Sequence, residues 1–98
     1  MLYSLTDKLK FDDQPQLQIK DEVLTINSDA ETVLKIMDVV ATRGETEGTI
    51  EAVNLLFSKE DREKLKKLKL SMEDYMTVIS TAMQLAVGED PDEEQREQ

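Results

Sequence analysis

The 98-residue sequence contains no cysteine, no histidine and no tryptophan. Without cysteine no disulfide can form, which suits a reducing compartment. Without cysteine and histidine, the usual zinc ligands and the usual nucleophile–base pairs of enzymes are missing. We therefore expect no metal and no cofactor, and we interpret the chain as a non-enzyme.

Long apolar runs and glycine-rich loops are also missing. No apolar run approaches the roughly 20 residues that a membrane-spanning helix needs. The first eleven residues, MLYSLTDKLKF, lack the apolar centre of a signal peptide. With only three glycines, the chain has neither a phosphate-binding loop nor a dinucleotide fingerprint. We expect no membrane partner.

Positive charge is scarce, because 12 lysines and arginines stand against 22 aspartates and glutamates, a net charge of −10. A field of this sign repels nucleic-acid phosphates and anionic membranes, so we expect no nucleic-acid partner. Residues 89–98 hold six acids and one arginine, and therefore half of the net charge. We predict a single domain over residues 1–88 and a disordered acidic C-terminal tail over residues 89–98.

The segment LQIKDEVLTIN predicts a short β-hairpin. A turn at residues 21–22 would pair Ile19 with Leu24 and Leu17 with Ile26 on one face of the hairpin. The turn lacks the Asn-Gly or Asp-Gly sequence that most favours a tight hairpin.

Helix signals follow the hairpin. Ser28 begins the S-x-x-E spacing of a capping box, and Ser58 and Ser71 each precede an aspartate by three residues. Gly44 and Gly88 stand where glycine commonly ends a helix. We predict a mainly α fold (α+β), with a short N-terminal β-hairpin followed by three to four helices. The apolar spacing predicts inward-facing side chains at Val33, Ile36, Met37, Val40, Ile50, Val53, Phe57, Leu65, Leu68, Met72, Tyr75, Met76, Ile79, Ala82, Met83 and Ala86.

A few apolar residues fall away from these predicted core faces. Val78 and Leu85 lie seven residues apart in the last helix, and Val39 lies off the face of the first. Single exposed apolar residues are common, but an i, i+7 pair favours a partner helix or a self-association face. We predict a homo-oligomer with interface residues Val39, Val78 and Leu85, and we interpret Leu55 as ordinary surface. The methionines are interpreted as core filling, although methionine-rich surfaces also adapt to varied partners.

The sequence from residue 26 to residue 90 resembles the short tail assembly chaperones of long-tailed phages and prophages of Gram-positive bacteria. The resemblance is carried by the capped helix after a short hairpin, by the stretch LLFSKEDREKLKKLKLSMEDYMTVISTAM, and by the acidic end after AVGED. It covers residues 17–90 and contains no catalytic motif.

The resemblance implies a function. Members of that family are made in the host bacterial cytoplasm, coat the long helical tape measure protein and keep it soluble until tube subunits polymerise around it. Many are also made in an extended form by a programmed ribosomal frameshift. The resemblance thus implies the tape measure protein as partner, no place in the mature virion, and a solubilising role for the acidic tail.

Two alternatives remain open. One is a small acidic phage-encoded regulator or DNA mimic that binds a host protein, but a mimic needs its acids spaced on one surface like phosphates. Here the acids gather at predicted caps and in the tail. Catalysis by the adjacent acid pairs ranks behind both other hypotheses, because general acid catalysis requires a carboxyl group shifted by burial or by a partner.

Overall fold

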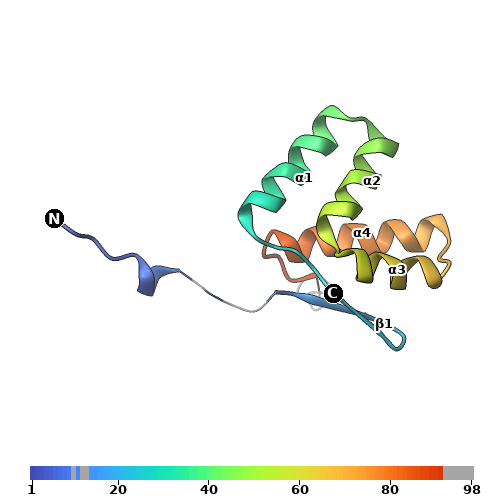
Figure 1. Ribbon diagram of the computed structural model, residues 1–98, viewed down its shortest axis with the longest axis horizontal. Coiled ribbons are helices and arrows are strands. Elements are labelled where there is room, and N and C mark those ends of the chain that lie inside the picture. Colours follow the sequence, from blue (N-terminus) through green and yellow to red (C-terminus); the bar gives the residue numbers. More distant parts are fainter. Residues whose placement is uncertain (10, 12–13, 92–98) are drawn as a thin grey trace, which may run out of the picture.

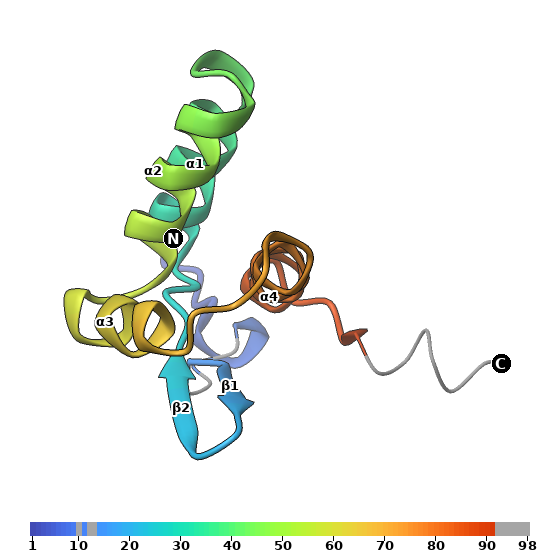
Figure 2. The same cartoon turned by 90° about the vertical axis from the view of Figure 1, so that its right-hand side faces the viewer.

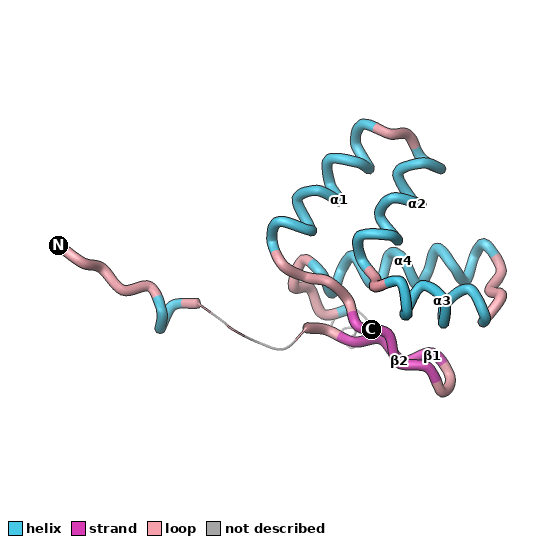
Figure 3. Tube along the Cα trace, viewed as in Figure 1, coloured by secondary structure: helices cyan, strands magenta, loops and turns pink. Residues whose placement is uncertain are grey.

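A two-stranded hairpin and four helices follow one another along the chain (Figures 1 and 3). The computed structural model describes residues 1–9, 11 and 14–91. The mainly α fold with an N-terminal hairpin is confirmed, whereas residues 92–98 of the predicted tail lie outside the described residues. The elements are the 3-10 turn η1 (Thr6–Lys8), β1 (Gln16–Ile19), β2 (Glu22–Thr25), α1 (Ala30–Thr42), α2 (Glu45–Leu56), α3 (Lys59–Lys67) and α4 (Met72–Ala86).

The hairpin turns at residues 20–21, one residue earlier than predicted. Leu17 lies opposite Leu24 rather than opposite Ile26, so the predicted register is wrong by two residues. Lys20 makes this turn possible by adopting a positive φ of 54°, a conformation that usually favours glycine or asparagine. A shift of two residues preserves the alternation of side chains, and Leu24 and Ile26 are still fully buried together.

The free edge of β2 is held by two side chains of α3. The Thr25 N–H donates a hydrogen bond of 2.9 Å to Asp61 Oδ2, and Lys64 Nζ donates one of 3.2 Å to the Val23 carbonyl. Asp61 and Lys64 also form an ion pair of 3.4 Å with each other. This edge therefore meets charged partners from its own chain instead of standing open to another strand.

Three helices begin at side-chain caps, two of them as predicted. Ser58 and Ser71 each accept a hydrogen bond from the backbone N–H three residues on. The predicted cap at Ser28 is wrong, because Asp29 accepts from both the side chain and the backbone N–H of Thr32. Those two hydrogen bonds stabilise the carboxylate and lower the pKa of Asp29.

Two glycines mark helix ends, as predicted. Gly44, at φ 84°, follows the end of α1 and begins α2. Gly88, at φ 89°, ends α4: its N–H donates to the Leu85 carbonyl, and the Glu89 N–H donates to the Gln84 carbonyl. This pair of bonds is a Schellman motif, which satisfies carbonyls that the helix leaves unpaired.

The antiparallel helices α1 and α2 stand together above the other elements (Figures 1 and 2). They approach closely at Gly48, where an added Cβ would lie 3.2 Å from both the Val39 carbonyl oxygen and Val40 Cα. Val39 is only 4% exposed. The prediction that Val39 lies away from the buried face of its helix is therefore wrong.

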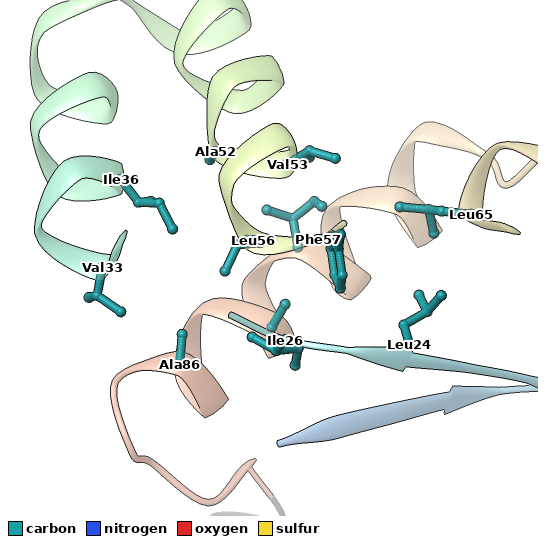
Figure 4. Packing of buried hydrophobic residues seen from close by; sticks show 12 residues of the cluster. Leu24, Ile26, Val33, Ile36, Ala52, Val53, Leu56, Phe57, Leu65 and Ala86 are labelled. Carbon is teal, nitrogen blue, oxygen red and sulfur yellow. The ribbon is translucent and has the colours of Figure 1, made fainter. Parts of the chain in front are cut away.

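The core lies where the lower ends of α1 and α2 meet β2, α3 and α4 (Figure 4). Its largest fully buried side chains come from α1, from β2 and the residue after it, and from the end of α2 and the residue after it. The helix α4 contributes Ile79, Ala82 and Ala86. Those largest side chains are Leu24, Ile26, Ile36, Leu56 and Phe57.

Some predicted core residues are instead at the surface. The upper parts of α1 and α2 pack on each other, and one flank of α4 is left open, so part of each apolar face has no partner within the described residues. The corrected residues, with their exposed fractions, are Met37 (55%), Val40 (53%), Ile50 (56%), Met72 (75%) and Met76 (40%).

Candidate interaction surface

An apolar groove opens between α2 and the N-terminal half of α4. It encloses a hollow of about 280 Å³, and we refer to it as the α2–α4 groove. Its lining residues are Glu45, Thr46, Thr49, Ile50, Met72, Tyr75 and Met76.

Three large apolar side chains in this groove face solvent. Ile50 and Met72 are more than half exposed, and Met76 is 40% exposed. A cluster of apolar side chains left open in this way is typical of an interaction site. Methionine is unbranched and polarisable, and it therefore fits differently shaped partners at little cost.

Tyr75 joins the groove to a second hollow, of about 320 Å³, that runs toward α3. Burial raises the pKa of Tyr75 above its ordinary value of 10.0. Its phenol, like that of an ordinary tyrosine, is neutral at physiological pH and can donate a hydrogen bond. The two hollows share Ile50 and Tyr75, and the second is completed by Val53, Asn54, Arg62, Glu63, Leu65 and Lys66.

The helix α2, which gives the groove one wall, is anchored at its C-terminal end by two side chains from outside the helix. Arg62 donates to the carbonyls of Asn54 and Phe57 at 2.9 and 2.8 Å. Asn27 donates from its side chain to the Leu55 carbonyl at 2.9 Å, and from its backbone to the Leu56 carbonyl at 2.8 Å. The last carbonyls of a helix otherwise lack partners, so these bonds anchor the end of α2.

The end of the groove at which both helices begin is acidic. The first turn of α2 carries Glu45 and Glu47, and the first turn of α4 carries Glu73 and Asp74. Because Glu45 and Met72 line the same hollow, the two acidic turns lie at the same end of the groove. A partner segment with basic residues next to apolar ones would match both features.

The structure does not place the predicted interface residues in this groove. Val78 and Leu85 are half-buried and pack against the core, as does Leu55, while Val39 is buried. The flank of α4 that carries Val78 and Leu85 packs against the core, whereas on the opposite flank Met72 and Met76 are open and Met83 packs against the core. Self-association and the interface role of Val39, Val78 and Leu85 both stay predictions, although Val39 is buried within its own chain.

Within the described residues, no group of three or more acidic side chains is placed to hold a metal ion. Likewise, no helix in residues 1–9, 11 and 14–91 combines the length and the apolar character needed to cross a membrane. Comparisons with protein-family models, curated proteins and solved structures gave no match.

Proposed function

We propose that the chain is a non-enzymatic tail assembly chaperone of a long-tailed phage. In the host bacterial cytoplasm it would bind the tape measure protein and keep it soluble while the tail tube assembles. The observation that carries the proposal is the α2–α4 groove, in which Ile50, Met72 and Met76 are open to solvent. The resemblance of residues 17–90 to the tail assembly chaperones supplies the identity of the client.

The groove suits a helical client. An amphipathic helix binds a groove by inserting apolar side chains spaced at i, i+3 or i+4, and i+7. A tape measure protein is one very long helical chain, so its chaperone must accept many segments of different sequence. Flexible methionine side chains at the surface permit such variation, because they repack around different partners.

The charge of the chain suits the same role. Each bound copy would add a net charge of −10 to the complex. Coated clients would then repel one another, which keeps them from aggregating. The acidic first turns at the end of the groove would favour client segments in which lysine or arginine flanks the apolar stripe.

The proposal is tested by co-expression of the chain with the tape measure protein of the same tail gene cluster. The measured quantity is the fraction of tape measure protein that stays in the supernatant after lysis and centrifugation. The groove variant Ile50→Asp/Met76→Asp places two charges in the groove and should lose most of this effect. The matched control is Leu34→Asp/Met37→Asp, which changes two exposed apolar residues of α1 that do not line the groove.

The outcomes separate the parts of the proposal. Soluble tape measure protein with the wild type and the control, but not with the groove variant, supports both the function and the groove. Equal loss with both variants would overturn the assignment to the groove. An insoluble tape measure protein beside well-expressed wild type would overturn the proposed function itself.

A further inference from the structure

A second unpartnered apolar surface lies at the start of the chain. We call residues 1–11 the N-terminal arm, of which the structure describes residues 1–9 and 11. These residues lie away from the helical body (Figure 1). Every large apolar side chain described in the arm is at least 52% exposed, namely Met1, Leu2, Tyr3, Leu5, Leu9 and Phe11.

The arm has the pattern of a segment that binds a groove. Leu2, Leu5 and Leu9 follow the spacing i, i+3, i+7, which places them on one face of a helix. The 3-10 turn over Thr6–Lys8 already forms one turn inside this stripe. An apolar stripe of this kind has nothing to cover it within the described part of its own chain.

The arm also carries the opposite charge to the rest of the protein. Its charged side chains are Asp7, Lys8 and Lys10, a net charge of +1. Residues 12–98 therefore carry a net charge of −11, which gives the total of −10. The α2–α4 groove ends at two acidic helix turns, with Glu45 among its lining residues. The arm and the groove therefore match in both apolar character and charge.

We propose that the arm of one copy binds the α2–α4 groove of a second copy, with Leu2, Leu5 and Leu9 against Ile50, Met72 and Met76. If each copy gives its arm to the other, the exchange closes as a two-fold dimer. This contact occupies the groove in which the proposed client also binds. Arm exchange and client binding therefore exclude each other at one groove, but the self-association itself needs only this chain.

The position of the arm favours a second copy over its own chain. The arm leads into β1, which begins near the C-terminal end of α4, whereas the groove lies at the other end of that helix (Figures 1 and 2). The ten residues from Met76 to Ala86 span about 15 Å of helix. To fill its own groove, the arm would have to reverse direction and cross that length, whereas a second copy can present its groove without this reversal.

The test uses the full chain and two double variants. Leu5→Asp/Leu9→Asp disables the arm and leaves the groove intact, and Ile50→Asp/Met76→Asp disables the groove and leaves the arm intact. All four side chains are at least 40% exposed, and circular dichroism checks that both variants keep their helices. Sedimentation velocity over a concentration series should show self-association of the wild type, and a weakening of roughly thirtyfold or more in each variant alone.

Mixing the two variants then identifies the contact. The arm variant still offers a groove and the groove variant still offers an arm, so an equimolar mixture should form a heterodimer although neither variant associates alone. The control Leu34→Asp/Met37→Asp should associate like the wild type.

Every other outcome contradicts the exchange. An arm variant that associates alone would show a contact that does not need the arm, and a groove variant that associates alone would show a contact that does not need the groove. A monomeric wild type, or a mixture that stays monomeric, would mean that the arm does not bind a second copy. Because only this chain is present, these failures are distinct from failure to bind the tape measure protein.

Discussion

Asp61 attaches the hairpin to α3, and the loss of free energy of unfolding on its replacement can be predicted from the structure. Replacing Asp61 by alanine removes the acceptor for the half-buried Thr25 N–H, which it binds at 2.9 Å. A buried donor left without its partner costs about 1–3 kcal/mol. The lost ion pair with Lys64, whose side chain is 34% exposed, adds about 0–1 kcal/mol because water screens it. We expect Asp61→Ala to lower the free energy of unfolding by about 2–3 kcal/mol.

Two further variants separate the hydrogen bond from the charge. Asp61→Asn keeps an oxygen that can accept from the Thr25 N–H and loses only the charge, so it should cost about 1 kcal/mol or less. Lys64→Met removes the cation and leaves the carboxylate bonded to the hairpin. It should therefore cost about as little as Asp61→Asn, through the ion pair and the bond to the Val23 carbonyl.

The assay is urea unfolding, monitored by far-ultraviolet circular dichroism. The free energies of unfolding of the three variants are compared with one shared value for the slope of free energy against urea concentration. An Asp61→Ala variant within about 0.5 kcal/mol of the wild type would refute the reasoning, because a change that small is typical of an ordinary surface position. Equal losses for Asp61→Ala and Asp61→Asn would show that the charge, and not the hydrogen bond, holds the hairpin.

Three further predictions concern the helices. Gly48→Ala gains about 1 kcal/mol of helix propensity, but its Cβ would lie 3.2 Å from backbone atoms of Val39 and Val40, a crowding that costs about 1–3 kcal/mol. We expect a net loss of about 1 kcal/mol in urea unfolding, and a gain would contradict the close approach. Ser71→Ala removes the cap of α4 and should cost about 1 kcal/mol in thermal unfolding, whereas an unchanged midpoint would mean that the cap contributes nothing. Because the pKa of Tyr75 is raised, its contribution to stability is present below its ordinary pKa of 10.0 and is lost as pH rises through the raised value. Tyr75→Phe should therefore lose less stability than the wild type as the pH rises above 10.0, and identical losses would contradict burial of the phenol.

Local signals in the sequence predict most of the fold. The caps at Ser58 and Ser71 and the glycines at the ends of α1 and α4 act within a few residues, so spacing alone identifies them. The hairpin is predicted for the same reason. Its register is not, because the turn uses a left-handed Lys20, which no turn preference indicates.

The contacts that position α2 and the hairpin were not predictable from spacing. Asp61 reaches Thr25, 36 residues away, and Asn27 reaches the Leu55 carbonyl, 28 residues away. An aspartate in the first turn of a helix is already explained by its favourable interaction with the helix dipole. The sequence therefore gives no reason to expect that Asp61 also has a long-range partner.

The candidate site could not be predicted from the sequence, because its apolar residues have the same spacing as core residues. Met72, Met76 and Ile50 continue helical stripes, and helical spacing gives the direction of an apolar face but not which part of it meets a neighbour. In α4 the core covers Val78, Leu85 and Met83 in part and leaves Met72 and Met76 open. No local signal separates Met72 and Met76, which are open, from Met83, which lies on the same stripe and packs against the core.

The most direct test of the central claim observes the methionine methyl groups while a client binds. The chain has five methionines, so selective methyl labelling gives a simple NMR spectrum. The arm variant Leu5→Asp/Leu9→Asp keeps the groove free of other copies, and the probe is a soluble segment of the tape measure protein. We predict that the resonances of Met72 and Met76 shift and saturate, while that of Met37, exposed on α1, stays in place. Saturating shifts at Met37 with Met72 and Met76 unchanged, or no shifts at any methionine, would contradict binding of the client in the α2–α4 groove.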